Sequence, residues 1–496
     1  MPRSCRKPAS IGASIRNTTI TATTGWPISP IFARGGDPAL IERARSWVKG
    51  SNKRNAEASR GEHLVAAFAE DVALNRLPTV SWIVAPYIMC EHPSACPSYG
   101  EALTAQLLDV LASNKDVWTK TAFVLNYDEN DGFFDHMPPP IPAITPDMGA
   151  STVDVTGEIY KGVPFGLGPR VPMIVVSPWT AGGFVNSQVF DHTSVLRFLE
   201  TRFGIAAPNI SDWRRAVTGD LTSVFDFTQR GALKHFSDGV NGMQRADKQC
   251  KLPPPKYLSE DLPRQEKGNR PARALPYDLH VDGQVTANGF QIDFTNKGAA
   301  GAAFRIAASD AKTGPWFFTV EAGKRLPYTL PRKGAYDFSV LGPNGFFRRF
   351  AGGGSDMIEI DFGHDKASGE LRGEARNGSG FPVTLMLRNA YASADANRSI
   401  SNPESRCCQA SPSRKTQIGT MSDLRRPAAL CVISRVISRP ACRAQATRCL
   451  AEESRAALAR CYTESMLTVP NIITIMRIAL VPVFALAFVL PAIPRA

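Results

Sequence analysis

The sequence lacks the patterns that identify zinc modules and secretory leaders, although it contains ten cysteines. No two cysteines form a CxxC pair, and no histidine lies among the six cysteines between residues 407 and 461. A zinc module is therefore not expected. The amino-terminal stretch MPRSCRKPASIGAS has basic residues without an apolar core, so no secretory signal peptide is predicted.

The positive charge of the chain is unevenly distributed. A net charge of +12 would ordinarily suggest a nucleic-acid or anionic-membrane partner. Between residues 406 and 464, however, eleven basic residues occur with only four acidic ones, so the remainder of the chain is only mildly basic. The overall charge therefore gives no reason to expect a nucleic-acid partner.

Two cysteines, Cys90 and Cys96, lie close together in a Pro-rich segment. A short disulfide between them is one interpretation, and two unpaired thiols are the other. The spacing leaves both interpretations open.

Residues 37–226 show an alternation of apolar runs and amphipathic segments that is typical of an α/β fold. Helices are predicted at residues 64–74, 102–111 and 192–204, the last ending at Gly204 as a C-cap. Strands are predicted in the runs LPTVSWIVAP, TAFVLNYDEN and RVPMIVVSP. Continuous Val, Ile and Leu runs between helices favour a parallel sheet covered on both faces.

The later part of the chain has a different texture. A Pro-rich linker is predicted at residues 231–275, followed at 276–364 by short alternating strands with Gly-rich turns, the pattern of an antiparallel β-sandwich. Residues 365–400 resemble the start of a second, incomplete β domain, which should be marginally stable alone. Residues 401–465 are basic, Cys- and Arg-rich and without clear periodicity. Residues 466–492 are apolar enough to predict a terminal membrane-spanning helix.

Polar side chains follow each of the three predicted α/β strands. Glu91 and His92 follow the first strand, and Asp128 and Glu129 follow the second. The third strand leads through a Gly-rich loop to Asp191 and His192. Ligands bind beyond the carboxyl ends of strands in open parallel sheets. Carboxylates beside a histidine suit a divalent cation that organises phosphate-ester chemistry.

Each of these residues also has a structural interpretation. Asp128 and Glu129 can be solvated turn residues, and His92 can be a hydrogen-bonded loop histidine. Asp191 can cap a helix whose first turn contains His192, and for this pair the structural role is the preferred interpretation. The remaining acidic and histidine side chains of the second cluster can simply fix the loop before three prolines: Asp131, Asp135 and His136.

Several long segments resemble bacterial phospholipases C of a phosphoesterase family that also includes an acid phosphatase branch. The resemblance covers residues 34–230, and the β-rich part is similar to the carboxyl-terminal domains of the same enzymes, which usually occur as two copies. The matching segments are LPTVSWIVAP, EHP, WTKTAFVLNYDENDGFFDH, STVDVTGEIY, GLGPRVPMIVVSPW, QVFDHTSVLRFLE and PNISDWRRAVTGDLTSVFDF.

This resemblance implies an alkaline-phosphatase-like architecture and hydrolysis of phospholipid head groups such as those of phosphatidylcholine. It implies that Asp128 and Glu129 bind a divalent metal ion of unspecified identity. It further implies that His92 binds phosphate or protonates the leaving group. Possible supporting positions around these residues are Glu91, Asp135, His136, Asp191 and His192.

Two motifs of the resembled family do not occur in the sequence. They are an ENxSFDHYFG-type metal motif and the Ser/Thr nucleophile, which is expected in an amino-terminal half that this chain lacks. A truncated enzyme with weak or no hydrolysis is therefore expected, because catalytic residues act as a unit. An acid phosphatase-like monoesterase and a non-catalytic lipid-binding remnant are the alternatives.

The first thirty residues are hypothesised to be read out of frame. With permitted codons, a one-nucleotide shift converts RNTTITATTGWPIS at residues 16–29 into QEYDDYGDDGLADF, which is similar to the family pattern. Residues 401–465 are also hypothesised to be read out of frame. The alternative is that they form a basic tail that binds anionic lipid. Residues 466–492 resemble the first membrane helix of a CDP-alcohol phosphatidyltransferase without its aspartate motif.

The expected partner is a phospholipid substrate or membrane surface, and the oligomeric state is left open. The resemblance implies export to the periplasm or the extracellular space. Membrane association through residues 470–491 is a further expectation.

Overall fold

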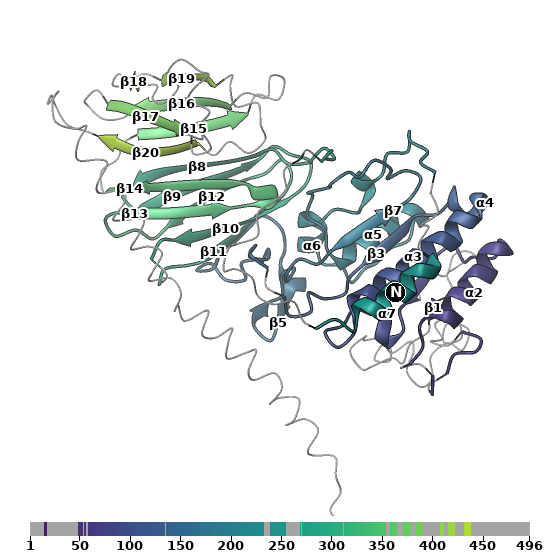
Figure 1. The fold of residues 1–496 in the computed structure, drawn as a ribbon. Helices are drawn as coiled ribbons and strands as arrows, with labels where there is room; N and C mark the ends of the chain where they lie inside the picture. Colours follow the sequence, from purple (N-terminus) through teal and green to yellow (C-terminus); the bar gives the residue numbers. More distant parts are fainter. Residues whose placement is uncertain are drawn as a thin grey trace, which may run out of the picture. The chain divides into compact units, whose positions relative to one another are not determined.

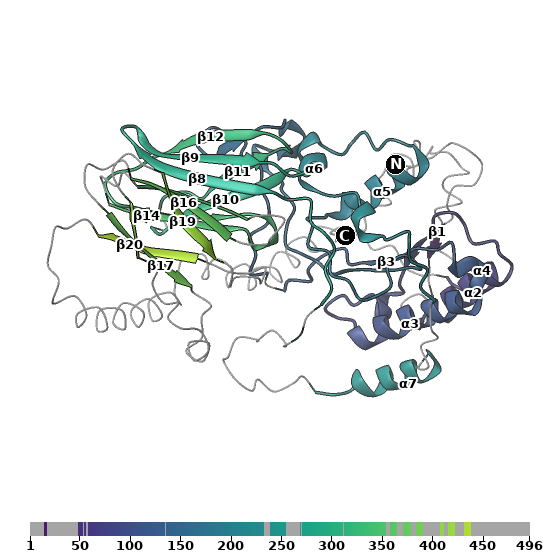
Figure 2. The same ribbon diagram turned by 90° about the horizontal axis from the view of Figure 1, so that it is seen from above.

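A computed structural model of the protein describes residues 48–353 with short gaps, together with Ser14–Arg16 and six later strands (Figures 1 and 2). The gaps are residues 53, 56–57, 134, 233–238, 254–267, 269 and 311. The chain divides into two units, one comprising Met1–Ser379 with Ser413–Leu430 and the other Gly380–Pro412 with Cys431–Ala496. The candidate site and the β-sandwich both belong to the first unit.

A helical layer built from α2 (Glu62–Ala73), α3 (Pro97–Ser113) and α4 (Lys115–Trp118) precedes strand β3 (Phe123–Asn126) in the sequence. Its core is a cluster of apolar side chains that are 0–7% exposed: Leu64, Phe68, Val72, Met89, Leu103, Leu107, Leu108, Leu111, Val117 and Trp118. The i, i+4 spacing of Leu64 and Phe68, and of Leu103 and Leu107, places each pair on one helix face. The predicted helices in this region are confirmed.

Helix α5 (His192–Phe203) begins and ends as the sequence predicts. The Asp191 side chain accepts a hydrogen bond from the backbone N–H of Thr193, and the Ser194 hydroxyl completes a capping box. Gly204 has a φ of 62°, the left-handed conformation of a helix C-cap. The preferred structural role of Asp191 is confirmed.

The parallel pairing predicted for the α/β region is wrong for strands β3 and β7 (Met173–Val176), which lie next to the site. Strand β3 pairs with β7 in antiparallel register, with Phe123 opposite Val176. A parallel pair needs a crossover, usually an α-helix. The described chain between β3 and β7 instead contains short strands and a 3-10 helix. The sequence could not reveal this direction, because apolar side chains do not encode whether a strand runs parallel or antiparallel to its neighbour. Strand β2 (Trp82–Val84) pairs in parallel with β1 (Ser14–Arg16).

Two sheets form the β-sandwich of the first unit. One has the order β14-β13-β10-β11-β4 and the other β12-β9-β8. All their neighbouring strands are antiparallel except β4, which runs parallel to β11. Their bounds are β4 Gly149–Ser151, β8 Leu279–Thr286, β9 Gly289–Asn296, β10 Ala302–Ala308, β11 Trp316–Val320, β12 Arg325–Leu330, β13 Tyr336–Leu341 and β14 Phe347–Gly352.

The core between these sheets is rich in phenylalanine. The Phe294 ring of one sheet lies 4.9 Å from Phe304 and 4.7 Å from Phe318 of the other, measured between centroids. Alternation of buried and less buried positions along β9 matches the period of two of a half-buried strand. The predicted antiparallel β region is confirmed.

Strand β4 connects the sandwich to the region that carries the site. Gly149 has a φ of 133°, and a Cβ there would lie 1.9 Å from the carbonyl oxygen of Phe317, so only glycine fits. The buried Trp213 indole donates a hydrogen bond of 2.8 Å to the Thr319 hydroxyl. Backbone pairing and a buried hydrogen bond therefore join the two regions.

The predicted linker at residues 231–275 contains a helix and a disulfide partner. Helix α7 (Gly239–Gln249) packs against α3 (Figure 1). Cys250, which follows this helix, forms a disulfide with Cys96. Gly239 and Gly242 weaken helix propensity, so the packing and the disulfide explain why the helix forms. The alternative of a Cys90–Cys96 disulfide is wrong, since Cys90 is an exposed free thiol.

Two further three-stranded sheets follow the sandwich in sequence. The first has the order β15-β16-β19, and the second, in the other unit, has the order β18-β17-β20. Their bounds are β15 Ile358–His364, β16 Leu371–Asn377, β17 Val383–Asn389, β18 Cys407–Ala410, β19 Lys415–Met421 and β20 Cys431–Ile437. Three of these strands lie in the segment 401–465, where the sequence predicted no regular structure. The β-branched residues of CVISRVI in β20 are compatible with a strand.

No helix in the described part of the chain is long and apolar enough to cross a membrane. The apolar segment 466–492 lies outside the described residues, as do residues 17–29 of the proposed out-of-frame segment.

Candidate metal site beyond strand β3

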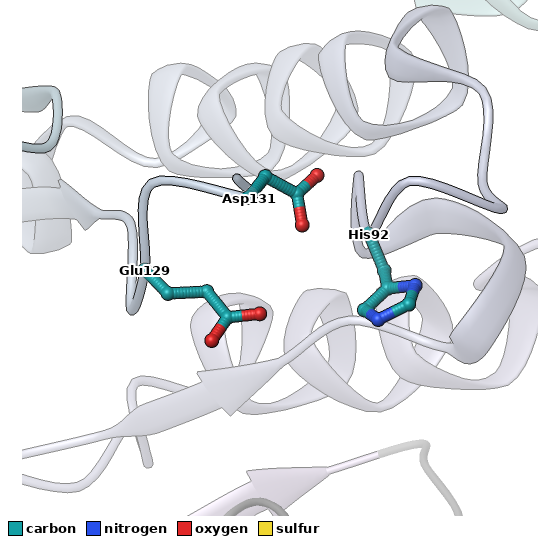
Figure 3. A group of neighbouring side chains, drawn as sticks. All are labelled: His92, Glu129 and Asp131. Atoms are coloured by element: carbon teal, nitrogen blue, oxygen red, sulfur yellow. The ribbon is translucent and has the colours of Figure 1, made fainter. Parts of the chain in front are cut away.

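Three side chains converge beyond the carboxyl end of β3. They are His92, which follows the 3-10 helix η3 (Tyr87–Met89), and Glu129 and Asp131, which follow β3 (Figure 3). One potential ligand atom from each lies within 4.8 Å of the others. His92 and Glu129 are exposed and Asp131 is half-buried, so an ion at this point would remain open to solvent on one side.

Asp131 occupies a central position of a tight turn that begins directly after Glu129. Asp131 and Gly132 both have positive φ angles, 56° and 77°. The N–H of Phe133 closes the turn on the carbonyl of Asn130 at 2.9 Å, and the Asn130 amide donates to the Phe133 carbonyl at 2.7 Å. Positive φ at two central positions defines a type I′ turn, for which Asp-Gly is a preferred pair.

A hydrogen bond from the same segment reaches the loop that carries His92. The Tyr127 hydroxyl donates to Glu91 at 2.9 Å, and Glu91 has a φ of 64°. A Cβ on Gly100 would lie 2.2 Å from a Glu91 carboxylate oxygen, so the absence of a side chain at Gly100 makes room for Glu91. Burial, and then the hydrogen bond to Glu91, raise the pKa of Tyr127 to about 12. Tyr127 therefore remains a hydrogen-bond donor at neutral pH.

The His92 ring is held from its other side by hydroxyl groups. Its Nδ1 lies 3.2 Å from the Ser94 hydroxyl, which lies 2.8 Å from the Tyr87 hydroxyl. With Nδ1 engaged in this way, Nε2 is the ring nitrogen that can serve a metal ion or a substrate.

The other predicted site residues are placed elsewhere. Asp128 is exposed and is not part of the three-residue cluster. Asp135 accepts hydrogen bonds from Arg170, with 2.8 Å between the closest atoms, and this pairing lowers the Asp135 pKa well below its usual range. His136 is largely exposed beside Asp135. His192 Nε2 lies 2.9 Å from the backbone carbonyl of Tyr127 and supports the segment that leads to the cluster.

Asp191 belongs to a buried ion network rather than to the cluster. Arg214 contacts Asp191 through Nη1 at 2.6 Å and Glu158 through Nε at 2.8 Å. The Glu158 side chain is only 2% exposed and the Asp191 side chain 6%. Sequence reasoning missed Glu158 and Arg214, because their contact joins positions far apart in the chain.

Sequence reasoning also missed Asp131 as a cluster member. The available signal was the Asp131-Gly132 dipeptide, whose turn preference reverses the chain directly after Glu129.

A cavity of about 850 Å³ has Asn126, His192, Arg170, Arg273 and Arg305 among its lining residues, but none of the three cluster residues.

The donor set of the cluster fits a divalent cation. Two carboxylates supply hard oxygen ligands, and the imidazole extends the choice from Mg²⁺ and Ca²⁺ to Mn²⁺ and Zn²⁺. The exposed side of the cluster leaves room for water or a phosphoryl oxygen to complete the coordination.

Comparison with known proteins identifies two regions of the chain. A profile of the Phosphoesterase family matches residues 36–206, and a profile described as "Bacterial phospholipase C, C-terminal domain" matches residues 271–353. The candidate cluster and strand β4 lie inside the first match, and sandwich strands β8 to β14 lie in the second. The resemblance to bacterial phospholipases C predicted from the sequence is confirmed.

Individual relatives agree with the family profiles. The chain is 42% identical over 404 residues to the non-hemolytic phospholipase C of Burkholderia pseudomallei, covering 75% of this chain and 57% of that protein. It is 45% identical over 321 residues to the hemolytic phospholipase C of Pseudomonas aeruginosa, covering 57% of this chain and 44% of that protein. The chain thus spans about half the length of these relatives.

Proposed function

We propose that this chain, which carries a phosphoesterase-family domain followed by a phospholipase C C-terminal domain, acts in phospholipase C-type hydrolysis of phospholipid head groups. The observation that carries the proposal is the convergence of His92, Glu129 and Asp131 inside the phosphoesterase match. The matched C-terminal domain favours this reading over an acid phosphatase-like monoesterase.

In the proposed site, Glu129, Asp131 and Nε2 of His92 would hold a divalent cation. The chemistry supplied by a bound cation would be Lewis-acid polarisation of a phosphoryl oxygen. The closeness of a His92 ring nitrogen to carboxylate oxygens of Glu129 and Asp131, within 4.8 Å, supports a metal-binding role beside the phosphate-binding or proton-donor role that the resemblance implied. Tyr127, through Glu91, positions the loop that carries His92.

The proposed reaction hydrolyses the phosphodiester bond on the glycerol side of the head group. Water supplies the oxygen that ends on phosphorus, and the glycerol oxygen leaves with a proton as diacylglycerol. Phosphatidylcholine would thereby give phosphocholine. Since no described residue is assigned as the hydroxyl nucleophile, we expect slow turnover that is easiest to detect with a good leaving group.

A substrate comparison tests the proposal. Release of nitrophenol from nitrophenyl-phosphorylcholine, a diester, and from nitrophenyl phosphate, a monoester, is measured with Mn²⁺ or Zn²⁺ and with chelator. We expect metal-dependent release from the diester, reduced at least about 100-fold in Glu129→Gln, which loses a ligand.

Two other outcomes would contradict this function. Metal-dependent release from the monoester alone would support the acid phosphatase alternative. Metal binding without hydrolysis of either compound, or of phosphatidylcholine, would support the non-catalytic alternative.

A further inference from the structure

A short hairpin between the site region and the sandwich exposes four large apolar side chains. Strand β5 (Ile159–Tyr160) pairs with β6 (Val163–Pro164) through the two-residue turn Lys161-Gly162. The exposed fractions are 41% for Ile159, 54% for Tyr160, 59% for Val163 and 60% for Phe165. Lys161 and Gly162 have φ angles of 51° and 79°, the positive pair that a type I′ hairpin requires.

The hairpin presents apolar groups on both of its faces. Successive side chains of a strand point to opposite faces, yet both residues of β5 are exposed. The Tyr160 and Phe165 rings contact each other at 5.6 Å between centroids, and each residue is more than half exposed. The Lys161 Nζ lies 5.2 Å from the centroid of the Tyr160 ring. A hairpin that only shielded a core would bury one face.

The base of the hairpin is firmly held. Glu158, directly before β5, is 1% exposed and pairs with Arg214, which also pairs with the α5 cap Asp191. The N–H of Phe165 bonds the carbonyl of Glu158 at 2.8 Å, which closes the hairpin at its base. Because α5 also supports the metal-site segment through His192, hairpin and site share one helix as their support.

We infer that this hairpin is a membrane-docking element that inserts into the interfacial layer of a phospholipid bilayer. Aromatic side chains with a polar edge, such as that of Tyr160, favour the membrane–water interface, and Ile159, Val163 and Phe165 supply apolar area. Lys161 at the turn places one cation at the level of lipid phosphates. The choice of occupant rests on the proposed function, since a phospholipid substrate would be presented in a bilayer.

The size of the element favours a bilayer over a protein partner. Specific protein interfaces involve about 20–30 residues a side. The exposed apolar cluster comprises four residues within the seven-residue segment 159–165. Shallow interfacial insertion requires only a small apolar surface together with a cation, and both are present.

A fluorescent reporter tests insertion directly in the full chain. An environment-sensitive fluorescent amino acid replaces Val163, and in a control protein it replaces Leu252, which is 69% exposed elsewhere. Chelator is present, so hydrolysis plays no part. With vesicles of phosphatidylcholine and phosphatidylglycerol, we expect a blue shift and quenching by shallow spin-labelled lipids at position 163 only.

Substitutions then measure the contribution of the hairpin to vesicle binding. In Tyr160→Ser with Phe165→Ser, we expect affinity to fall at least about tenfold, while Leu252→Ser leaves it unchanged. Lys161→Asn keeps a residue that tolerates positive φ and should weaken binding to anionic vesicles about fivefold, with no effect on purely zwitterionic ones.

The inference is overturned if position 163 shows no spectral change on vesicles that bind the protein, or if the protein binds no vesicles. It is also overturned if the double variant changes only self-association, measured by sedimentation velocity, because the patch would then be a protein interface. Hydrolysis of soluble nitrophenyl-phosphorylcholine should not change in the hairpin variants. Absence of that activity from the wild-type protein, with intact vesicle insertion at position 163, would count against the proposed function alone.

Discussion

The sandwich and the metal-site loops lie in the same unit but are stabilised in different ways. The sandwich core contains thirteen residues, including Phe294 and Phe318, that are at most 4% exposed. In the site, His92 and Glu129 are exposed, and local order comes from a tight turn and from hydrogen bonds such as that of Tyr127. Burial sets the stability of the first region, whereas local geometry and charge would set the affinity of the proposed metal site in the second.

The largest expected effect on the free energy of unfolding comes from comparing alanine substitutions of two phenylalanines, one from each region. Phe318→Ala removes a fully buried ring and should lower the free energy of unfolding by about 3–5 kcal/mol. Phe133→Ala, in the site loop, removes a ring that is 77% exposed and should change it by less than about 0.5 kcal/mol. Urea denaturation measures both, and equal losses would remove the distinction between the regions.

Removal of the disulfide should give the next largest loss of stability. The disulfide holds one end of the loop between Glu91 and Cys96. Cys96 and Cys250 are 154 residues apart, so the double change to serine should lower the free energy of unfolding by about 2–4 kcal/mol. Thermal unfolding under non-reducing conditions measures the loss. The matched control Cys90→Ser alters a free thiol, and a comparable loss there would contradict the assigned pairing.

A moderate effect on stability is expected from the ion pair between Asp135 and Arg170. Asp135→Asn weakens the contact with Arg170 and should lower the free energy of unfolding by about 1–3 kcal/mol at neutral pH. Because the Asp135 pKa is lowered in the folded state, its contribution is present above about pH 4 and is lost as the pH falls further. The difference between wild type and variant should therefore shrink in acid, and a constant difference from pH 7 to pH 2 would be inconsistent with the pairing.

The smallest effect concerns the hydroxyl that links the two loops of the site. Tyr127→Phe should lower the free energy of unfolding by about 1 kcal/mol. Because the Tyr127 pKa is raised to about 12, its contribution is complete below about pH 10 and is lost as the pH rises toward 12. Unfolding measured between pH 8 and pH 12 checks this sign, and a difference that grows with pH would contradict it.

Local sequence patterns predicted the elements whose determinants lie close together in the chain. Helix α5 could be placed from Asp191 to Gly204 because capping chemistry is local. The direction of β3 relative to β7 and the pairing of Cys96 with Cys250 depend on contacts between distant residues, so periodicity and spacing could not determine them.

The sequence predicted the kind of site, a divalent metal site, but not all of the residues that form the cluster. The sequence placed His92 and Glu129 after strands, and the structure brings them together with Asp131. The sequence pattern predicts a loop role for Asp131, because a turn residue and a metal ligand have the same sequence signature. Asp135, by contrast, forms an ion pair with Arg170, a partner 35 residues away.

Calorimetric titration with Mn²⁺ tests the central claim, that His92, Glu129 and Asp131 form a divalent metal site. The two informative variants are Asp131→Asn and Asp128→Asn, which remove the same charge from neighbouring positions. The proposed geometry predicts at least about tenfold weaker binding for Asp131→Asn and nearly wild-type binding for Asp128→Asn. Weakened binding for Asp128→Asn alone, or equal binding by both variants and wild type, would contradict this site.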